Sequence, residues 1–231
     1  MKSYRAKLEV AEAFVALAEE MPIDKVTVGM VAERVGRHRK TFYYHFADKE
    51  ELIVWLFRYD LARGITQEFP VGELVFEPEG EPGAYPDLPF YVRNVLSDGR
   101  LYHAAFFFAL SRSLEHRRSY YRRVFSYRGT GSIEDYLYRL YCPQIKRDIA
   151  YLAARELDRL PPLERAERCR VLEAGAGTDF LAEFFTGAFI ERIVKRLVDE
   201  PAQRSLDDVR PFENIIHDSL ELLFAHVVRP K

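Results

Sequence analysis

The sequence predicts an all-α fold, with a small N-terminal helical domain followed by a larger C-terminal helical bundle. Apolar residues recur at three- and four-residue spacing through most of the 231 residues, which is the pattern of amphipathic helices. No alternation of apolar and polar residues persists, so strands are not expected. A glycine separates two very short helical segments near the N-terminus, an arrangement typical of a helix-turn-helix.

The N-terminal segments give three expected helices. Residues 4–20 carry apolar side chains at helical spacing and form the first. Thr27 is placed to cap a short second helix, and Gly36 ends it, because glycine readily adopts the left-handed conformation that closes a helix. Residues 38–45 follow at once as the third helix, and the three together predict the helix-turn-helix.

A fourth helix is expected to connect the two parts of the chain. Asp48 is its predicted N-cap, and the acidic residues just after it suit the positive end of a helix dipole. We expect an N-terminal domain of residues 1–58 and a C-terminal domain of residues 59–231. Residues 64–89, rich in Pro, Gly and acidic side chains, are expected to form an irregular loop.

Apolar residues at helical spacing resume after this loop and continue to the end of the chain. Two glycines, Gly175 and Gly177, are expected to break this pattern between the fifth and sixth of these helices. The expected helices cover residues 90–96, 101–110, 113–125, 133–160, 162–173, 179–198 and 206–228.

Charge and composition limit the class of protein. The formal net charge is −2, yet five basic or potentially basic side chains fall within seven residues: Arg34, Arg37, His38, Arg39 and Lys40. A local basic cluster suits a nucleic-acid contact better than the overall sum suggests. Apolar runs are too short to span a bilayer and no secretory signal is visible, so a cytoplasmic protein without a membrane partner is expected. Cys142 and Cys169 have no ligand-type spacing, which argues against a disulfide framework or a zinc site.

Residues 26–52, VTVGMVAERVGRHRKTFYYHFADKEEL, carry the most specific pattern. It comprises a Thr before the second helix, the pair Val31-Ala32, the turn glycine, the triplet 41–43, the aromatic Phe46 and the ending 49–52. This string resembles the DNA-binding domain of the TetR family of bacterial regulators. The resemblance implies an all-helical dimer that binds double-stranded DNA, with repression as the commoner outcome in the family.

The resemblance also implies which residues contact DNA. The third helix can enter the major groove only if one side packs on the domain and the other offers hydrogen-bond donors, and Phe42 and Phe46 supply the packing side. Arg39 is the preferred base reader, because its planar guanidinium can bind guanine in a bidentate manner. The base-facing candidates are Arg39, Lys40 and Tyr44, and the phosphate-facing candidates are Thr27, Thr41, Tyr43, His45 and Lys49.

Some of these assignments have structural alternatives. Tyr43 and Tyr44 can instead be partly buried, and His45 can form a local hydrogen bond. Arg37 and His38 depart from the family pattern, which usually has an apolar residue and a small capping residue there. They weaken the expected start of the third helix and are hypothesised to add contacts to the DNA backbone.

The last two expected helices have wide apolar faces, and in the TetR family such a pair builds a four-helix dimer interface. The segment FLAEFFTGAFIERIVKRLVDE is also similar to the family branch that includes activators of dihydroxyacetone kinase operons. That similarity leaves open either a small-molecule effector or a protein coregulator. The candidate interface residues are Phe184, Phe185, Ala188, Phe189, Ile216, Leu220, Leu223 and Phe224.

The candidate effector-pocket residues are Tyr102, His103, Arg112 and Tyr138, although core packing is the favoured interpretation for any single aromatic residue of the C-terminal part. No phosphate loop, nucleophile elbow or metal-ligand spacing is present, so no catalytic residues, metal or cofactor are expected. The predicted function is a homodimeric regulator that binds a palindromic operator and is switched by an effector. An enzyme with a vestigial N-terminal motif and a protein-interaction module are the competing interpretations.

Overall fold

The computed structural model describes residues 2–127, 132–173, 176–200, 202 and 204. Over these residues the fold is all-α apart from one very small sheet, which confirms the predicted fold class. The helices are α1 (Lys2–Glu20), α2 (Val28–Val35), α3 (Arg39–His45), α4 (Lys49–Glu68), α5 (His103–His116), α6 (Arg118–Ser126), α7 (Ile133–Asp158), α8 (Pro162–Glu173) and α9 (Ala176–Val194). Short 3₁₀ turns cover Ile23–Lys25 and Val71–Glu73, and a π-helical turn, η3, covers Lys195–Asp199.

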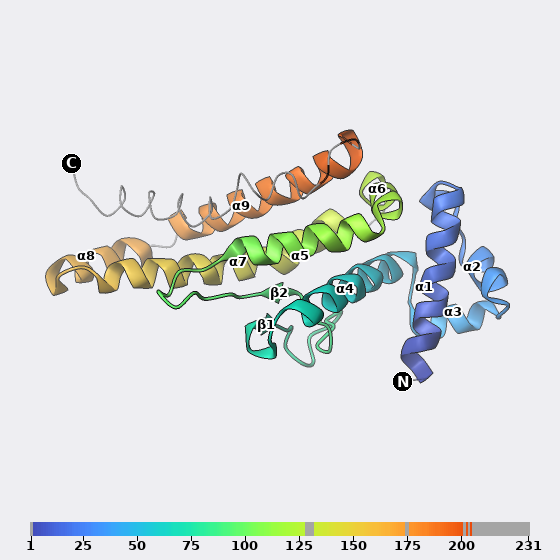
Figure 1. The fold of residues 1–231 in the computed structure, drawn as a ribbon, viewed down its shortest axis with the longest axis horizontal. Helices are drawn as coiled ribbons and strands as arrows, with labels where there is room; N and C mark the ends of the chain where they lie inside the picture. The colour runs from blue at the N-terminus through green and yellow to red at the C-terminus, as the bar shows by residue number, and fades with distance from the viewer. Residues whose placement is uncertain (1, 128–131, 174–175, 201, 203, 205–231) are drawn as a thin grey trace.

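The molecule is elongated, with α1–α3 gathered at one end and α8 at the other (Figure 1). Helices α5, α7 and α9 run along the length between them, and α7 packs along α9. Helix α4 leads from the N-terminal helices into this body and packs against α1, α5 and α7. The predicted boundary between residues 58 and 59 therefore lies within a single continuous helix.

The local signals predicted the first four helices well. The Thr27 hydroxyl accepts a hydrogen bond from the Met30 amide at 3.3 Å, and the Asp48 carboxylate accepts one from the Glu51 amide at 2.7 Å. Gly36 has φ = 67°, the left-handed conformation in which glycine avoids the strain that a Cβ would cause. These three residues set the ends of α2 and the start of α4.

The segment between α4 and α5 differs from the prediction. Helix α4 continues to Glu68, so Gly64 lies inside a helix and the irregular stretch begins later than expected. Residues 90–96 are not a helix, because β2 (Tyr91–Val92) pairs antiparallel with β1 (Leu74–Val75) and Val95 bridges to Leu101. The pairing joins segments about sixteen residues apart, which local periodicity does not reveal.

Further boundaries also shift. Helices α5 and α6 are divided at Arg117 instead of near residue 111, and Gly177 lies within α9 instead of breaking it. Gly175 and the last expected helix, residues 206–228, lie outside the described residues.

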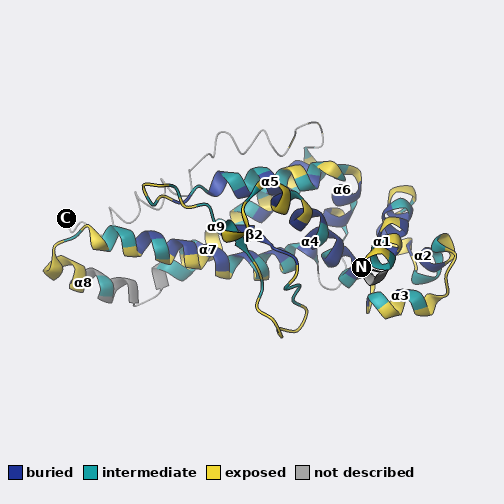
Figure 2. Cartoon of the chain, turned by 60° about the horizontal axis from the view of Figure 1, so that its bottom comes forward, coloured by how far each residue is buried: buried dark blue, intermediate teal, exposed yellow. Residues whose placement is uncertain are grey.

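One hydrophobic core joins the N-terminal helices to the body. It includes Phe14 of α1, Trp55 of α4, Tyr120 of α6 and Leu197 of the π-helical turn, each at most 1% exposed. Exposed residues lie mainly on the outer sides of α2, α3 and α8 and on the irregular segment (Figure 2). The outer side of α3 is thus held on a rigid support.

Candidate nucleic-acid interface

Helix α3 has one buried and one exposed side. Phe42 and Phe46 are each 1% exposed and lie 5.8 Å apart between ring centroids, and Phe46 packs edge-on to Trp55 at 5.6 Å. Tyr43 and Tyr44 are 59% and 80% exposed, so the structure favours the outward placement of both over burial. The buried phenylalanines fix the helix, and the opposite side is free to meet a ligand.

The predicted cations of this region lie mostly on the exposed surface. Arg37, His38, Arg39 and Lys40 are all exposed, at the turn after α2 and in the first residues of α3. Arg34, the fifth basic residue of the cluster, is held by Glu20 through two hydrogen bonds of 2.6 and 2.8 Å. The free basic charge is therefore concentrated where α3 begins.

The Arg39 guanidinium lies against the first turn of α2. A Cβ atom at Gly29 would stand 2.6 Å from the Arg39 Nη2 atom and 3.0 Å from the Arg39 Nε atom. Any residue other than glycine at this position would therefore displace the Arg39 side chain. Gly29 was not among the residues predicted from the sequence to have a role. No local pattern reveals this contact, because it joins two helices.

The start of α3 is weakly capped, as the departure from the family pattern suggests. His38 is the N-cap residue but makes no side-chain capping bond, whereas Thr27 and Asp48 cap α2 and α4. The first amide groups of α3 therefore lack the usual side-chain acceptor.

Three further candidates are less exposed. Thr41, His45 and Lys49 are half-buried. The Lys49 ammonium donates to the Ile23 carbonyl at 3.2 Å and lies 5.0 Å from the centre of the Tyr127 ring, so it also fastens α4 to neighbouring segments. Burial, followed by the charge of Lys7, lowers the pKa of His45, which makes it a poor source of positive charge.

Lys7 is a residue that the sequence analysis missed. Its ammonium lies 4.8 Å from the Phe46 ring centre and 4.9 Å from that of Trp55, and burial lowers its pKa. Stacking of a cation on two aromatic rings ties α1 to the end of α3. A lone lysine within an amphipathic helix gives no sequence signal for such a role.

Helix α6 joins the N-terminal helices to the body. Arg117, which precedes it, forms ion pairs with Glu12 of α1 and, at 3.0 Å, with Asp60 of α4. The Tyr121 hydroxyl donates to Asp60 at 2.7 Å. These contacts connect a movement of α6 directly to α1 and α4.

The four effector-pocket candidates are not gathered at one described cavity. Buried His103 of α5 lies 3.4 Å from the Asp148 carboxylate of α7, and exposed Arg112 forms an ion pair with Glu68. Tyr102 is the N-cap residue of α5, and half-buried Tyr138 interacts with Cys142 of α7. None of the four lines the described pockets.

The dimer candidates within the described residues divide into two groups. Phe184, which is 57% exposed, and Ala188 point outward from α9, and Phe180 stacks on Phe184 with ring centroids 6.1 Å apart. Phe185 and Phe189 pack within the chain, the latter against Phe107 at 4.5 Å. The remaining candidates, Ile216, Leu220, Leu223 and Phe224, lie outside the described residues.

In the part of the chain that the structure describes, no cluster of three or more His, Cys, Asp or Glu side chains could hold a metal ion. The helices described also include none with the length and apolar character needed to cross a membrane.

Comparisons with known proteins agree with this geometry. Residues 11–54 match the model of the family described as bacterial regulatory proteins, tetR family. Among solved structures, the fold is similar to that of "Dihydroxyacetone kinase operon activator DhaS", with a TM-score of 0.52, 14% identity, and coverage of 94% of this chain and 97% of that chain. The search of curated proteins gave no match. The family match covers α2, α3 and the exposed face described above, so residues 11–54 resemble the DNA-binding domain of tetR-family regulators, and the chain is accordingly described as a DNA-binding transcriptional regulator.

Proposed function

We propose that the chain acts as a homodimer that binds a palindromic operator, represses transcription and is released by an effector. The observation that carries this proposal is the two-sided character of α3, with Phe42 and Phe46 buried and Tyr43 and Tyr44 exposed. A short helix anchored in this way can enter a major groove, and two of them about one DNA turn apart read a palindrome. Residues 1–58 would bind DNA, and residues 59–231 would dimerise and bind the effector.

Within the groove, we assign base contacts to Arg39, Lys40 and Tyr44. Their exposure and their position on the outer side of α3 support this assignment. Contacts with the phosphate backbone are assigned to Thr27, Arg37, His38, Thr41, Tyr43, His45 and Lys49. His45 would act through a neutral hydrogen bond, since its lowered pKa disfavours the charged form.

Dimerisation is proposed through the outer side of α9. Phe184 and Ala188 are available to a partner, and an exposed stacked pair of phenylalanines is unusual on a surface that stays in water. Phe185 and Phe189 would support this surface from inside the chain. The four candidates beyond residue 205 complete the proposed interface.

Operator binding can be tested by fluorescence anisotropy with DNA from the region upstream of the coding sequence, in an excess of unrelated DNA. We expect specific binding, and we expect Arg39→Ala to weaken it by about tenfold to a hundredfold, as for loss of one bidentate base contact. Tyr44→Ala should also weaken it, whereas Arg159→Ala, an exposed substitution on the far end of α7, should not. A genome-wide selection that yields no bound sequence would overturn the proposal.

The dimer can be tested by size-exclusion chromatography with light scattering. Phe184→Glu should give a monomer, because it places a charge in the centre of the proposed interface. Leu163→Glu is the matched control, since Leu163 is 89% exposed on α8 and lies outside that interface. A monomeric parent protein, or a Phe184→Glu variant that stays dimeric, would contradict this arrangement.

Repression is distinguished from activation by a reporter gene under the bound promoter. Deletion of the chain should raise reporter expression if it represses. The structurally similar DhaS is described as an activator, so a fall in expression would assign the opposite sign.

A further inference from the structure

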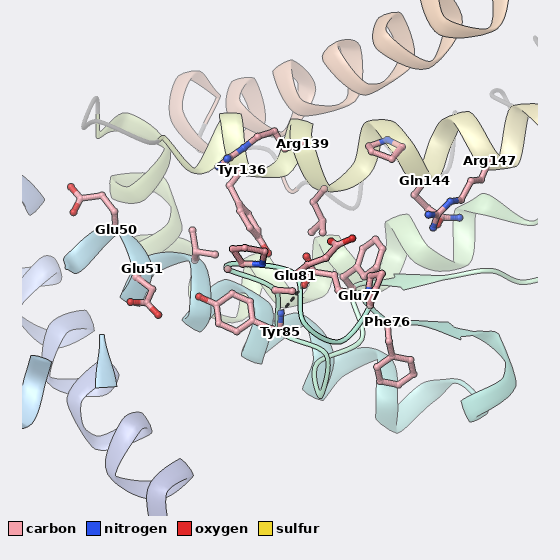
Figure 3. A pocket seen from close by; sticks show the side chains of 18 of the residues that line it. Glu50, Glu51, Phe76, Glu77, Glu81, Tyr85, Tyr136, Arg139, Gln144 and Arg147 are labelled. Carbon is pink, nitrogen blue, oxygen red and sulfur yellow. Dashed lines mark hydrogen bonds between the residues drawn. The ribbon is translucent and has the colours of Figure 1, made fainter. Parts of the chain in front are cut away.

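A pocket of about 600 Å³ lies between the irregular segment, the beginning of α4 and one side of α7 (Figure 3). This volume is within the range of small-molecule sites. Glu50 and Glu51 of α4 lie at one end, and Gln144 and Arg147 of α7 lie at the other. The pocket therefore connects the middle of the body to the helix that directly follows α3.

The α7 wall of the pocket is one stripe of the helix. Its members recur every three or four residues, which places them on the same face: Tyr136, Arg139, Leu140, Pro143, Gln144 and Arg147. A single rigid helix thus presents aromatic, apolar, amide and guanidinium groups together.

Gln144 has hydrogen-bonding capacity that the protein does not use. The side chain is only 3% exposed, and its Nε2 donates to the Asp148 carboxylate at 3.2 Å. Because a carboxylate accepts, this bond fixes the orientation of the amide, and Oε1 has no partner among the described residues. A buried acceptor left unpaired is costly, so a ligand that displaces the side chains covering Oε1 and donates to it gains affinity.

Arg147 supplies a complementary donor beside it. It is exposed, and no carboxylate in the described part of the chain lies within ion-pair distance. Its guanidinium matches the planar geometry of a carboxylate better than an ammonium does. An acceptor and a cationic donor therefore lie together at this end.

The carboxylates at the other end are largely committed within the protein. Glu50 accepts from the Tyr127 hydroxyl at 2.8 Å and Glu51 accepts from the Ala47 amide at 2.6 Å, and between the two ends Glu77 is paired with the buried Arg58. These three carboxylates leave little capacity for a ligand, whereas exposed Glu81 also lines the pocket. At the other end, Gln144 and Arg147 can select the polar groups of a ligand.

Between the polar groups the lining is aromatic and apolar. Phe76 is 41% exposed and lies on the irregular segment at the same end of the pocket as Arg147. Pro143 and Phe90 also line the pocket. Such a surface suits a flat ring.

We propose that this pocket is the effector site and that it binds an aromatic carboxylate that also carries a hydrogen-bond donor. The carboxylate binds the Arg147 guanidinium, the donor binds Gln144 Oε1, and the ring packs against Phe76. This inference rests on the proposed function for its regulatory meaning, since Glu50 and Glu51 belong to the first turn of α4, and only three residues separate α4 from α3.

The experiment is isothermal titration calorimetry of the full chain, without DNA, against the three isomeric hydroxybenzoates. Benzoate lacks the donor and phenol lacks the carboxylate, so they are the single-group controls. At least one isomer should bind about tenfold or more tightly than either control, as for one satisfied buried polar group. If no isomer binds more tightly than benzoate and phenol, the proposal is wrong.

Two variants locate the site. Arg147→Ala should reduce hydroxybenzoate affinity to the level of phenol, and Gln144→Met should reduce it to the level of benzoate. Arg159→Ala, which lies outside the pocket, is the control and should bind like the parent. Because Arg147 is exposed, its loss should not impair folding, and an unchanged affinity in Arg147→Ala would overturn the assignment whatever happens to Gln144→Met.

The regulatory step is tested separately, by adding the binding isomer to the DNA complex and following anisotropy. Calorimetry without DNA tests the ligand site, and anisotropy with DNA tests operator binding. Either measurement can give a positive result when the other is negative, so failures of the two proposals are distinguishable. Trp55, the single tryptophan of the chain, packs on Phe46 and directly follows Val54, which lines the pocket, so its emission should change on binding. Ligand binding without any effect on DNA affinity would show that the pocket is not the effector site.

Discussion

Arg39 of α3 lies against Gly29 of α2 so closely that a methyl group on Gly29 would stand 2.6 Å from the Arg39 Nη2 atom. The proposed base reader therefore depends on the absence of a side chain on another helix.

Gly29→Ala should consequently separate stability from recognition. Alanine favours a helix over glycine by up to about 1 kcal/mol, so the free energy of unfolding should not fall. The displaced Arg39 side chain should reduce the preference for operator over unrelated DNA. Urea denaturation measures the stability and competition anisotropy measures the preference for operator DNA. An unchanged preference in Gly29→Ala would show that recognition does not depend on the position of Arg39 against Gly29.

Arg37 should contribute to affinity without contributing to sequence preference. If it contacts a phosphate, Arg37→Ala should reduce the slope of log affinity against log salt by about 0.9. Arg34→Ala is a matched control three residues away, because Arg34 is already held by Glu20. Equal slopes for Arg37→Ala and the parent would remove Arg37 from the interface.

The uncapped start of α3 offers a stabilising substitution. His38→Ser supplies the acceptor that the first turn lacks and should raise the free energy of unfolding by about 1 kcal/mol. Asp48→Ala should lower it by a similar amount, because it removes the capping bond to the Glu51 amide. Chemical denaturation of both variants checks the pair, and a His38→Ser variant no more stable than the parent would contradict the capping argument.

Asp60 should give the protein a distinctive pH dependence. Burial raises its pKa above the ordinary 3.8, only partly opposed by the Tyr121 hydroxyl and Arg117. The folded state then holds this proton more tightly than the unfolded chain, so the contribution of Asp60 to stability falls as the pH rises through its folded pKa.

Asp60→Asn removes that titration. The slope of unfolding free energy against pH, just above pH 3.8, should become more positive in the variant than in the parent. Urea denaturation at a series of pH values provides the comparison. Parallel curves for the two proteins would indicate that Asp60 titrates normally.

The parts of the fold that the sequence predicted are those set by short-range chemistry. Thr27, Gly36 and Asp48 mark helix ends through bonds to residues three or four positions away, or through their own backbone conformation. The strand at Tyr91–Val92 was missed because its partner lies in a separate segment. The division between α5 and α6 was misplaced because Arg117 is held by Glu12, more than a hundred residues earlier.

The candidate interface was predictable for a related reason. Buried Phe42 and exposed Tyr43 and Tyr44 follow from helical periodicity alone. Other features arise only where separate helices pack together. They are the contact of Arg39 with Gly29, the stacking of Lys7 on Phe46 and the pocket along α7. The periodicity of a single sequence does not indicate which helices contact one another.

The continuous core from Phe14 through Trp55 and Tyr120 to Leu197 has a consequence for protein engineering. Sensor chimeras are commonly conceived as exchanges of one recognition module for another at a linker. Here the junction at residue 58 passes through α4, and the surface of α1 is completed by α6. A functional hybrid would have to transplant the inner face of α6, with Arg117, Tyr120 and Tyr121, together with the donor's N-terminal helices.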